Sequence, residues 1–253
     1  MYSQNNDSEN YGKVRYERVI NFDGNPSIST FNLFFNPDFS LFSETPIQPE
    51  EGVTLTSGSE DEFDVSIDVG YDGSKYLVLT DFDKKIIQSQ LSLLSDGQEK
   101  MYIVEEDLLR INWEISDEYK MINDLKAHKA VGSFRGRDYI AWFTYDIPVQ
   151  YGPWKLNGLP GLILNVSDSR NEVMFYAKEI YLQSEINSVS KNSFTFNSDL
   201  DTISLGEYVR LQGEQVEEVK KLFLSMLPKD TKVTMSKGKS HGLELEYEEK
   251  ITR

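Results

Sequence analysis

The sequence contains no cysteine. Disulfide bonds, thiolate metal ligands and a cysteine nucleophile are therefore excluded. Histidine is almost as scarce, because His128 and His241 are the only two, and neither belongs to an HxH or HExxH pattern. Such spacings bring metal ligands together, so we expect no metal site and no cofactor.

Long apolar runs are also missing. No stretch approaches the roughly 18 apolar residues of a membrane-spanning helix, so we expect no transmembrane segment. The first residues, MYSQNNDSENYG, lack the basic and apolar regions of a signal peptide. If the protein is exported, we expect this chain to be the mature form, without its leader.

Positive charge is in deficit. The 253 residues include 42 acidic and 26 basic side chains, which gives a net charge of -16. This charge repels the phosphates of nucleic acids, so nucleic acid is not an expected partner. A chain of this length buries roughly 70–75% of its unfolded surface, and it can build a core without covalent cross-links.

Short β-branched and aromatic runs follow one another along most of the chain. KVRYERVINF and SISTFNLFF flank a turn-forming cluster at Asp23–Pro26, and this arrangement predicts a hairpin. Similar runs recur up to KNSFTFN at residues 191–197, with turn residues between them. In RDYIAWFTYDI, Tyr139, Ala141 and Phe143 alternate with Ile140 and Trp142. This spacing predicts a curved antiparallel sheet, open or half closed as a barrel.

One segment has helical periodicity. Apolar residues between Tyr208 and Met226 recur at intervals of three and four, with Pro228 beyond them. Ser204 is a candidate N-cap, with Glu207 as its capping-box partner. We expect an α+β, mainly β fold with this C-terminal helix packed on the sheet and a final hairpin within 231–251. Residues 1–12 are predicted to be a flexible segment and 13–253 a single domain.

The stretch YGPWKLNGLPGLILNVSD, residues 151–168, is rich in backbone-directing residues. Gly152 and Pro153 precede Trp154, and Pro160–Gly161 is typical of a type II turn with positive φ at the glycine. The run Leu162–Leu164 is apolar on both faces and therefore predicts a central strand. No nucleophile or base lies in the stretch, so we interpret Gly152, Pro153, Gly158, Pro160 and Gly161 as structural residues.

Candidate ligand-binding residues cluster just before and within this stretch. Arg135 and Arg137 are two apart, which predicts one shared strand face, and guanidinium groups bind carboxylates or phosphates in pairs of hydrogen bonds. Internal ion pairs with the many acidic residues are the alternative use. The full set of candidates is Arg135, Arg137, Tyr139, Trp142, Tyr151, Trp154 and Lys155.

These residues resemble the GLPGLI family, an exported family of Bacteroidetes. The resemblance lies in Gly158–Ile163, which reads GLPGLI, in Gly152–Trp154, and in the preceding FRGRDYIAWFTYDIP. Upstream, Ser40–Phe42 and Ile111–Ile115 follow in the expected order. The resemblance implies a periplasmic or surface location. Where many members have a cysteine, this chain reads LKAHKA, and the family has no agreed catalytic residues that could be carried over.

The first functional hypothesis is a non-catalytic exported binding or carrier protein for a peptide or apolar ligand, working with an outer-membrane or other envelope protein. Its fold-level basis is that a curled sheet with a helix leaves an apolar concavity. The second hypothesis is a hydrolase that uses a carboxylate pair, with Asp138 and Asp146 as candidates. The third is a structural or assembly subunit of the cell envelope, which would expose an apolar patch.

Overall fold

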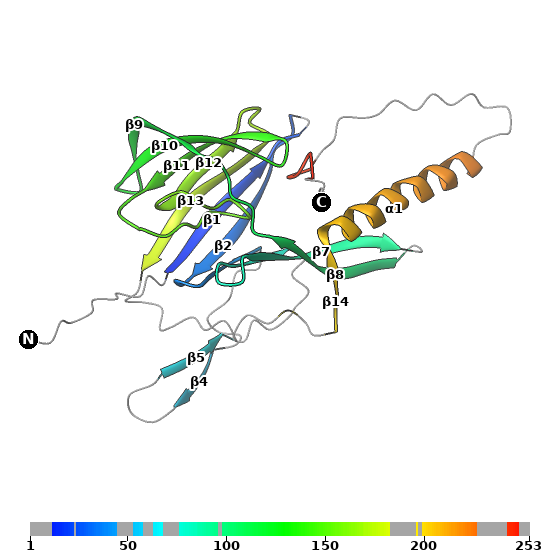
Figure 1. Ribbon diagram of the computed structural model, residues 1–253, viewed down its shortest axis with the longest axis horizontal. Helices are drawn as coiled ribbons and strands as arrows, with labels where there is room; N and C mark the ends of the chain where they lie inside the picture. Colours follow the sequence, from blue (N-terminus) through cyan, green and yellow to red (C-terminus); the bar gives the residue numbers. More distant parts are fainter. Residues whose placement is uncertain are drawn as a thin grey trace, which may run out of the picture.

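The computed structural model describes residues 12–22, 24–44, 53–57, 63–67, 76–95, 98–182, 196, 199–226 and 242–247. Strands dominate the described chain, and a single helix follows them (Figure 1). In chain order the elements are β1 Gly12–Ile20, β2 Ser27–Phe35, β3 Phe39–Ser43, β4 Val53–Ser57, β5 Phe63–Ile67, β6 Leu77–Asp81, β7 Ile86–Ser95, β8 Gln98–Asp107, β9 Glu114–Ile122, β10 Leu125–Phe134, β11 Arg137–Thr144, β12 Leu162–Asp168, β13 Val173–Leu182, β14 Asp201–Ser204 and α1 Leu205–Met226.

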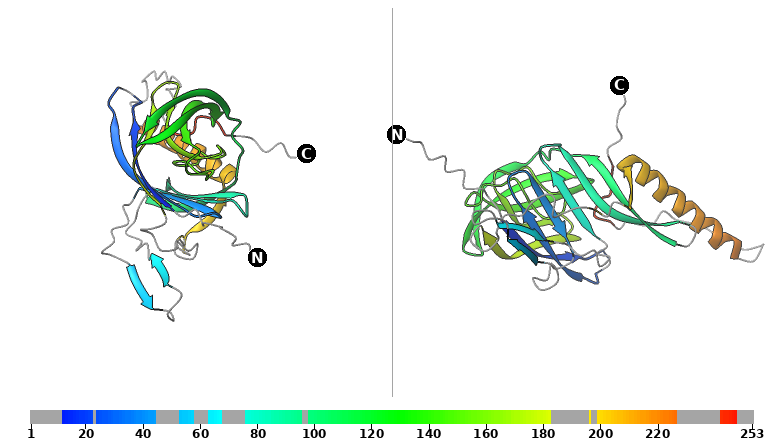
Figure 2. Two further views of the ribbon diagram at one scale, coloured as in Figure 1. Left: turned by 90° about the vertical axis from the view of Figure 1, so that its left-hand side faces the viewer. Right: turned by 90° about the horizontal axis from the view of Figure 1, so that it is seen from below.

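Twelve strands form one sheet in the order β14-β8-β7-β6-β3-β2-β1-β13-β12-β11-β10-β9. All neighbours are antiparallel except β14 and β8, which run parallel. The sheet curves strongly but stays open, with β14 and β9 as its edges (Figure 2). The predicted mainly β fold, with a curved sheet and one helix, is confirmed. Strands β4 and β5 form a separate two-stranded antiparallel sheet.

Irregularities in the ladders help the sheet to curve. The register shifts at Arg15/Tyr16 in β1, at His128/Ala130 in β10 and at Trp142/Phe143 in β11. Such bulges bend a strand and increase its twist. The shift in β11 lies between Trp142 and the buried Phe143.

The predicted central strand is confirmed as β12. It lies between β11 and β13, and Leu162, Ile163 and Leu164 have no exposed surface. The segment before it, residues 145–161, folds back into the curve of the sheet (Figure 2). Tyr151 bridges to Asn157, and the amide of Leu162 donates to the carbonyl of Ile147. The segment's side chains complete the core.

The expected role of Gly161 needs correction. Gly161 does not have a positive φ, whereas Gly158 has φ 92°. A Cβ at Gly161 would lie 1.9 Å from the carbonyl oxygen of Thr144. The glycine therefore allows the turn to approach the end of β11. Gly152 has a similar role, because its Cβ would lie 2.8 Å from the carbonyl oxygen of Leu156.

The predicted helix is α1, and the amide of Glu207 donates to Oγ of Ser204 as an N-cap requires. Its first turns pack on β7, β8 and β14 through a small second core that includes Tyr208 and Leu211. Further along, Val216 is exposed. Of the residues that the structure describes, no helix has the length and apolarity to cross a bilayer.

Two predicted terminal features are tested only in part. Residues 231–241 and 248–251 of the expected final hairpin lie outside the described residues, and 242–247 do not form a strand. At the other end, Gly12 begins β1, and the rest of the predicted flexible segment is outside the described chain. The single-domain organisation of 13–253 stays a prediction.

Replacing Gly161 with alanine should destabilise the fold by about 3 kcal/mol or more, because the new Cβ would collide with the backbone of Thr144. Gly213→Ala is the control, since it lies in α1 with open space around its Cβ. This change should stabilise the protein by up to about 1 kcal/mol. Urea unfolding measures both effects, and equal stability of the two variants would contradict the close approach.

Candidate functional site

The candidate site begins at the turn between β10 and β11. Arg135 and Gly136 have φ 52° and 76°, the backbone conformation of a two-residue type I′ hairpin turn. Asparagine or glycine usually occupies the first position, so an arginine there is strained. The predicted shared strand face of Arg135 and Arg137 is therefore wrong: Arg135 lies in the turn and Arg137 begins β11.

Lys155 reaches the site from the segment before β12. It follows Trp154, which has φ 60°, an unusual value for a bulky side chain. The amide of Leu156 donates to the carbonyl of Pro153 across this turn. The turn thereby directs the ammonium group of Lys155 toward β8, where its side chain is only 2% exposed.

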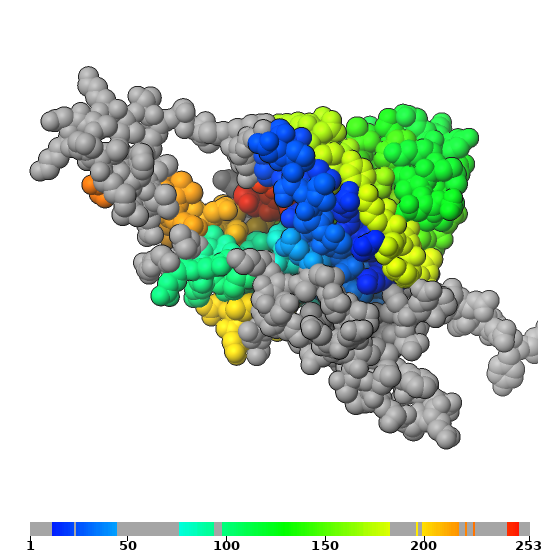
Figure 3. Space-filling view, turned by 180° about the vertical axis from the view of Figure 1, so that it is seen from behind, coloured from blue at the N-terminus to red at the C-terminus, as the bar shows by residue number. Residues whose placement is uncertain are grey.

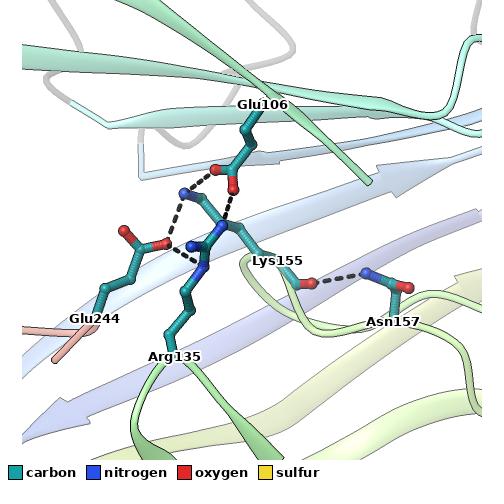
Figure 4. A network of polar contacts seen from close by, with 5 residues as sticks. All are labelled: Glu106, Arg135, Lys155, Asn157 and Glu244. Atoms are coloured by element: carbon teal, nitrogen blue, oxygen red, sulfur yellow. Dashed lines mark hydrogen bonds and ion pairs between the residues drawn. The ribbon is translucent and has the colours of Figure 1, made fainter. Parts of the chain in front are cut away.

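Four charged side chains meet in a buried cluster (Figure 4). Glu106 of β8 accepts from Nη2 of Arg135 with one oxygen and from Nζ of Lys155 with the other. Glu244 lies opposite, with Oε1 2.7 Å from Nζ of Lys155 and 3.8 Å from Nε of Arg135. We call Glu106, Arg135, Lys155 and Glu244 the charge cluster.

A second buried ion group lies next to it around Arg137. Nη1 of Arg137 is 2.5 Å from Asp168 and 2.9 Å from Glu172. Asp168 also accepts from the amides of Glu172 and Val173, so its carboxylate shapes the turn from β12 to β13. The remaining donors of Arg137, Nε and Nη2, bind the carbonyl of Gly242 at 3.2 and 2.6 Å.

Residues 242–247 thus touch both ion groups, and we call them the C-terminal strap. Leu243 packs against the main core, and the amides of Leu245 and Glu246 donate to the carbonyl of Arg135. The strap lies between the start of α1 and strands β1 and β2 (Figure 3). Tyr247 at its end lies 5.8 Å from the Arg135 guanidinium, ring centroid to Cζ.

A cleft of about 750 Å³ opens beside the charge cluster. It runs between the end of β8, strand β14, the first turns of α1 and the strap. Its lining is mixed: Ile86, Leu109, Ile203, Leu205, Val209 and Tyr247 contribute apolar surface, and Glu105, Glu106, Asp107, Arg135, Thr202, Ser204 and Gly206 contribute polar surface. A mixed lining of this kind suits an amphipathic ligand.

Some buried donor groups of this region have no acceptor. Nη1 and Nε of Arg135 and the hydroxyl of Tyr139 are buried without a hydrogen-bond partner in the described part of the chain. Burial, and then the charge of Glu244, raises the pKa of Tyr76 and Tyr208 above the ordinary value. These phenols stay protonated and remain donors at neutral pH.

The other predicted ligand residues lie in different surroundings. Tyr139 is buried, and burial is the main cause of its raised pKa; the charge of Arg137 lowers this pKa, and those of Asp168 and Glu244 raise it. Tyr151 is buried elsewhere, with its hydroxyl 2.6 Å from the carbonyl oxygen of Asn36. Trp142 is half-buried under Nζ of Lys120 at 4.1 Å. The seven candidates therefore do not form one site.

The carboxylate pair of the hydrolase hypothesis does not form. Asp138 is the second residue of β11 and Asp146 follows its end, and both are exposed. Eight residues of extended chain span about 26 Å, too far for cooperating carboxylates. The described residues also contain no cluster of three or more His, Asp or Glu that could hold a metal ion. His128 contacts Tyr145 instead, and His241 is outside the described residues.

Sequence reasoning missed the two acidic members of the charge cluster. Glu106 is two residues after the buried Val104 on β8, so strand alternation places its carboxylate on the inner face. Glu244 lies between Leu243 and Leu245, but residues 242–247 form no strand, so alternation does not place its carboxylate. The available signal was a glutamate, Glu106, at a position that strand alternation predicts to be buried. This signal does not identify the cation that pairs with it.

Residues 135–165 match the profile of a family described as "Protein of unknown function (Porph_ging)". The match contains Arg135, Arg137 and Lys155, and it covers a short stretch of the chain. This match supports kinship with a family of unknown function over residues 135–165, and it does not confirm the name GLPGLI. No curated protein matches the sequence.

The solved structures with a similar fold belong to a longer protein. PNGF-II, in a P21 and a C2 crystal form, aligns with a TM-score of 0.54 at 13% identity over 81% of this chain. The chain spans only 34% and 33% of those two chains. A LolA superfamily protein, NE2245 from Nitrosomonas europaea, aligns over 75% of this chain and 91% of its own at 7% identity. Its TM-score of 0.28 is too low to indicate a shared fold.

Glu106→Gln should destabilise the protein by about 3–5 kcal/mol, because it leaves Arg135 and Lys155 buried with Glu244 as their remaining carboxylate. Glu105→Gln is the matched control, because its carboxylate is exposed on the same strand and accepts a hydrogen bond from Gln88. Chemical denaturation of both variants provides the measurement. A loss below about 1 kcal/mol for Glu106→Gln would show that the cluster contributes little.

Tyr247 should make the stability pH-dependent in the alkaline range. Burial, followed by the charge of Glu244, raises the pKa of Tyr247 from 10.0 to about 12. Its contribution is complete below pH 10.0 and is lost as the pH rises toward about 12, because the unfolded phenol ionises first. The melting temperature of the wild type should therefore fall more steeply than that of Tyr247→Phe over this window. Tyr145→Phe, at an exposed position, should follow the wild type.

Proposed function

We propose that the protein is a non-catalytic binding protein and that the cleft beside α1 holds its ligand. The observation that carries this proposal is a 750 Å³ cleft in which one wall is apolar and the floor is a buried arginine with spare donors. Hydrogen-bond donors without acceptors are costly when buried, so they favour a ligand that supplies acceptors.

The lining indicates the chemistry of that ligand. Leu109, Ile203 and Val209 can contact an apolar part of the ligand, whereas Nη1 of Arg135 can donate a hydrogen bond to an acceptor group of the ligand. Glu105 and Asp107 line the same cleft and disfavour a multiply charged anion such as a phosphate dianion. A ligand with one carboxylate and an apolar part fits best.

The cellular setting is part of the proposal. The GLPGLI-like residues favour a protein of the Bacteroidetes envelope that works in the periplasm or on the surface with an outer-membrane partner. The match of residues 135–165 to a family of unknown function supports kinship in this region. Fractionation of the source cells tests the location, and recovery of the protein only with cytoplasmic markers would contradict it.

A second candidate, an assembly subunit, is favoured by one surface. The edge strand β9 exposes Ile115, Tyr119 and Met121, and Tyr145 is exposed nearby against His128. Exposed edges can pair with a strand of another protein. Charged residues alternate with these side chains, as in edges that avoid pairing, so we rank this function below ligand binding.

Binding of the fluorescent amphipathic anion 8-anilinonaphthalene-1-sulfonate tests the cleft. Arg135→Gln removes the guanidinium group that would bind the sulfonate, so it should weaken binding about tenfold. Val209→Trp fills the cleft from α1 without touching the charge cluster and should weaken binding similarly. The control, Arg210→Gln, changes an exposed arginine on the same helix and should bind like the wild type.

Thermal melting establishes that each variant is folded before its binding is compared. Unchanged affinity in a folded Val209→Trp variant would contradict the cleft as the site. Native mass spectrometry of the protein from its own cells adds an independent readout, in which a co-purifying carboxylate compound should be lost with Arg135→Gln.

A further inference from the structure

The C-terminal strap is held in the way that a receptor holds a bound peptide. Arg137 binds the carbonyl of Gly242, Lys155 binds the carboxylate of Glu244, and the carbonyl of Arg135 accepts the amides of Leu245 and Glu246. These contacts recognise a backbone carbonyl, an acidic side chain and two backbone amides in order along the strap, and Figure 4 shows the contact between Lys155 and Glu244.

The receptor side of these contacts comes from one part of the sequence. Arg135, Arg137 and Lys155 all lie within residues 135–165, the stretch that matches the family profile. The strap adds no strand to the sheet, and the amides of Leu245 and Glu246 both donate to the single carbonyl of Arg135. The receptor groove is therefore built without the strap.

The strap is an imperfect occupant of the groove. Oε1 of Glu244 is 2.7 Å from Lys155 but 3.8 Å from Nε of Arg135, beyond hydrogen-bond distance. Nη1 of Arg135 has no acceptor among the residues that the structure describes. A carboxylate that is free of the constraints of this chain can approach Arg135 more closely and satisfy donors that Glu244 leaves open.

Backbone strain points to the same residue. Arg135 keeps φ 52° in a turn where a glycine or asparagine would adopt this conformation with less strain. Residues held in such conformations are energetically costly and concentrate at functional sites. The strained turn both aims the guanidinium into the charge cluster and presents the carbonyl that binds the strap.

The charges that remain when the strap dissociates determine which ligand the groove binds. Without Glu244, the buried cations Arg135 and Lys155 face the single carboxylate of Glu106. The charge cluster without Glu244 therefore has one positive charge in excess, whereas Arg137 beside it faces the two carboxylates of Asp168 and Glu172. The charge cluster would select a carboxylate, and the cleft beyond Tyr247 gives room for further apolar residues.

We propose that Arg135, Arg137 and Lys155 form a binding groove for a peptide segment of a partner protein that places one carboxylate against Arg135 and Lys155, and that residues 242–247 occupy this groove in cis. The recognised segment has a glutamate or aspartate flanked by apolar residues, as in Gly-Leu-Glu-Leu-Glu-Tyr of the strap. This inference rests on the proposed function, because it names the ligand class of the same site.

A fluorescently labelled peptide with the sequence of residues 240–249, SHGLELEYEE, tests the proposal against the full-length chain. Glu244→Lys places a third cation against Arg135 and Lys155 and should expel the strap while the groove stays intact. Fluorescence anisotropy should then show at least about tenfold tighter peptide binding than in the wild type.

Glu246→Lys is the matched control, because Glu246 is exposed two residues further along the strap and should leave peptide binding at the wild-type level. A peptide with Gln at the position of Glu244 should bind the Glu244→Lys protein at least about tenfold more weakly than the parent peptide. Melting curves confirm that both protein variants are folded.

Equal peptide affinity in Glu244→Lys and wild type, or equal binding of the Gln peptide, would overturn the groove. The anion probe used for the cleft separates this failure from failure of the proposed function. If that probe still depends on Val209 while the peptide does not bind, the cleft binds a ligand of another class. If neither binds, the proposed function is wrong as well.

Discussion

A single buried carboxylate, that of Glu106, holds the candidate site together. It accepts from Arg135 and Lys155 at once, and these residues belong to a hairpin turn and to the segment before β12. Buried charges are costly unless they are paired, so the end of β8, the β10–β11 turn and this segment must stay in one mutual arrangement. Strand β8 lies near one edge of the sheet and β10 near the other. The ion pairs therefore connect the two ends of an open sheet, whose edge strands do not pair with each other.

The position of the cleft follows from how the curved sheet is filled. Residues 145–161 occupy the concave side, where Tyr151, Trp154 and Leu156 are buried with the strands. The hollow expected for a carrier is thus closed by the chain itself. Space remains where the main core ends and the small core under α1 begins, around Tyr102 and Tyr208. The charge cluster lies beside this boundary, where its side chains are buried but pair with one another.

The sequence identified the elements better than their long-range partners. Alternation and helical periodicity predicted the strands, α1 and the central position of Leu162–Leu164, because these patterns depend on neighbouring residues. The pairing of Arg135 with Glu106 depends on the order of strands in the sheet, which no local pattern contains. Gly136 illustrates this limit of local sequence patterns. Its positive φ closes the hairpin and separates two arginines that strand spacing would place on one face.

The glycine motif shows a different limit. Pro160–Gly161 has the composition of a type II turn, and the turn chemistry correctly marked a sharp change of direction before β12. It did not predict that Gly161 is needed for the approach to Thr144 or that Gly158 has the positive φ. A close contact between distant segments and a special backbone conformation both require glycine, and composition alone does not separate them.

A groove that contains two buried cations creates a problem for the unliganded protein. One carboxylate cannot neutralise both, and an unpaired buried charge costs about 3–5 kcal/mol. Glu244 solves this problem in cis, so the free energy available to an external peptide is only the difference between its carboxylate and that of the strap. That difference is small unless the peptide satisfies the donors of Arg135 that Glu244 leaves open. Binding of this kind is exchangeable and selective, because a partner must make better hydrogen bonds than the strap in order to replace it.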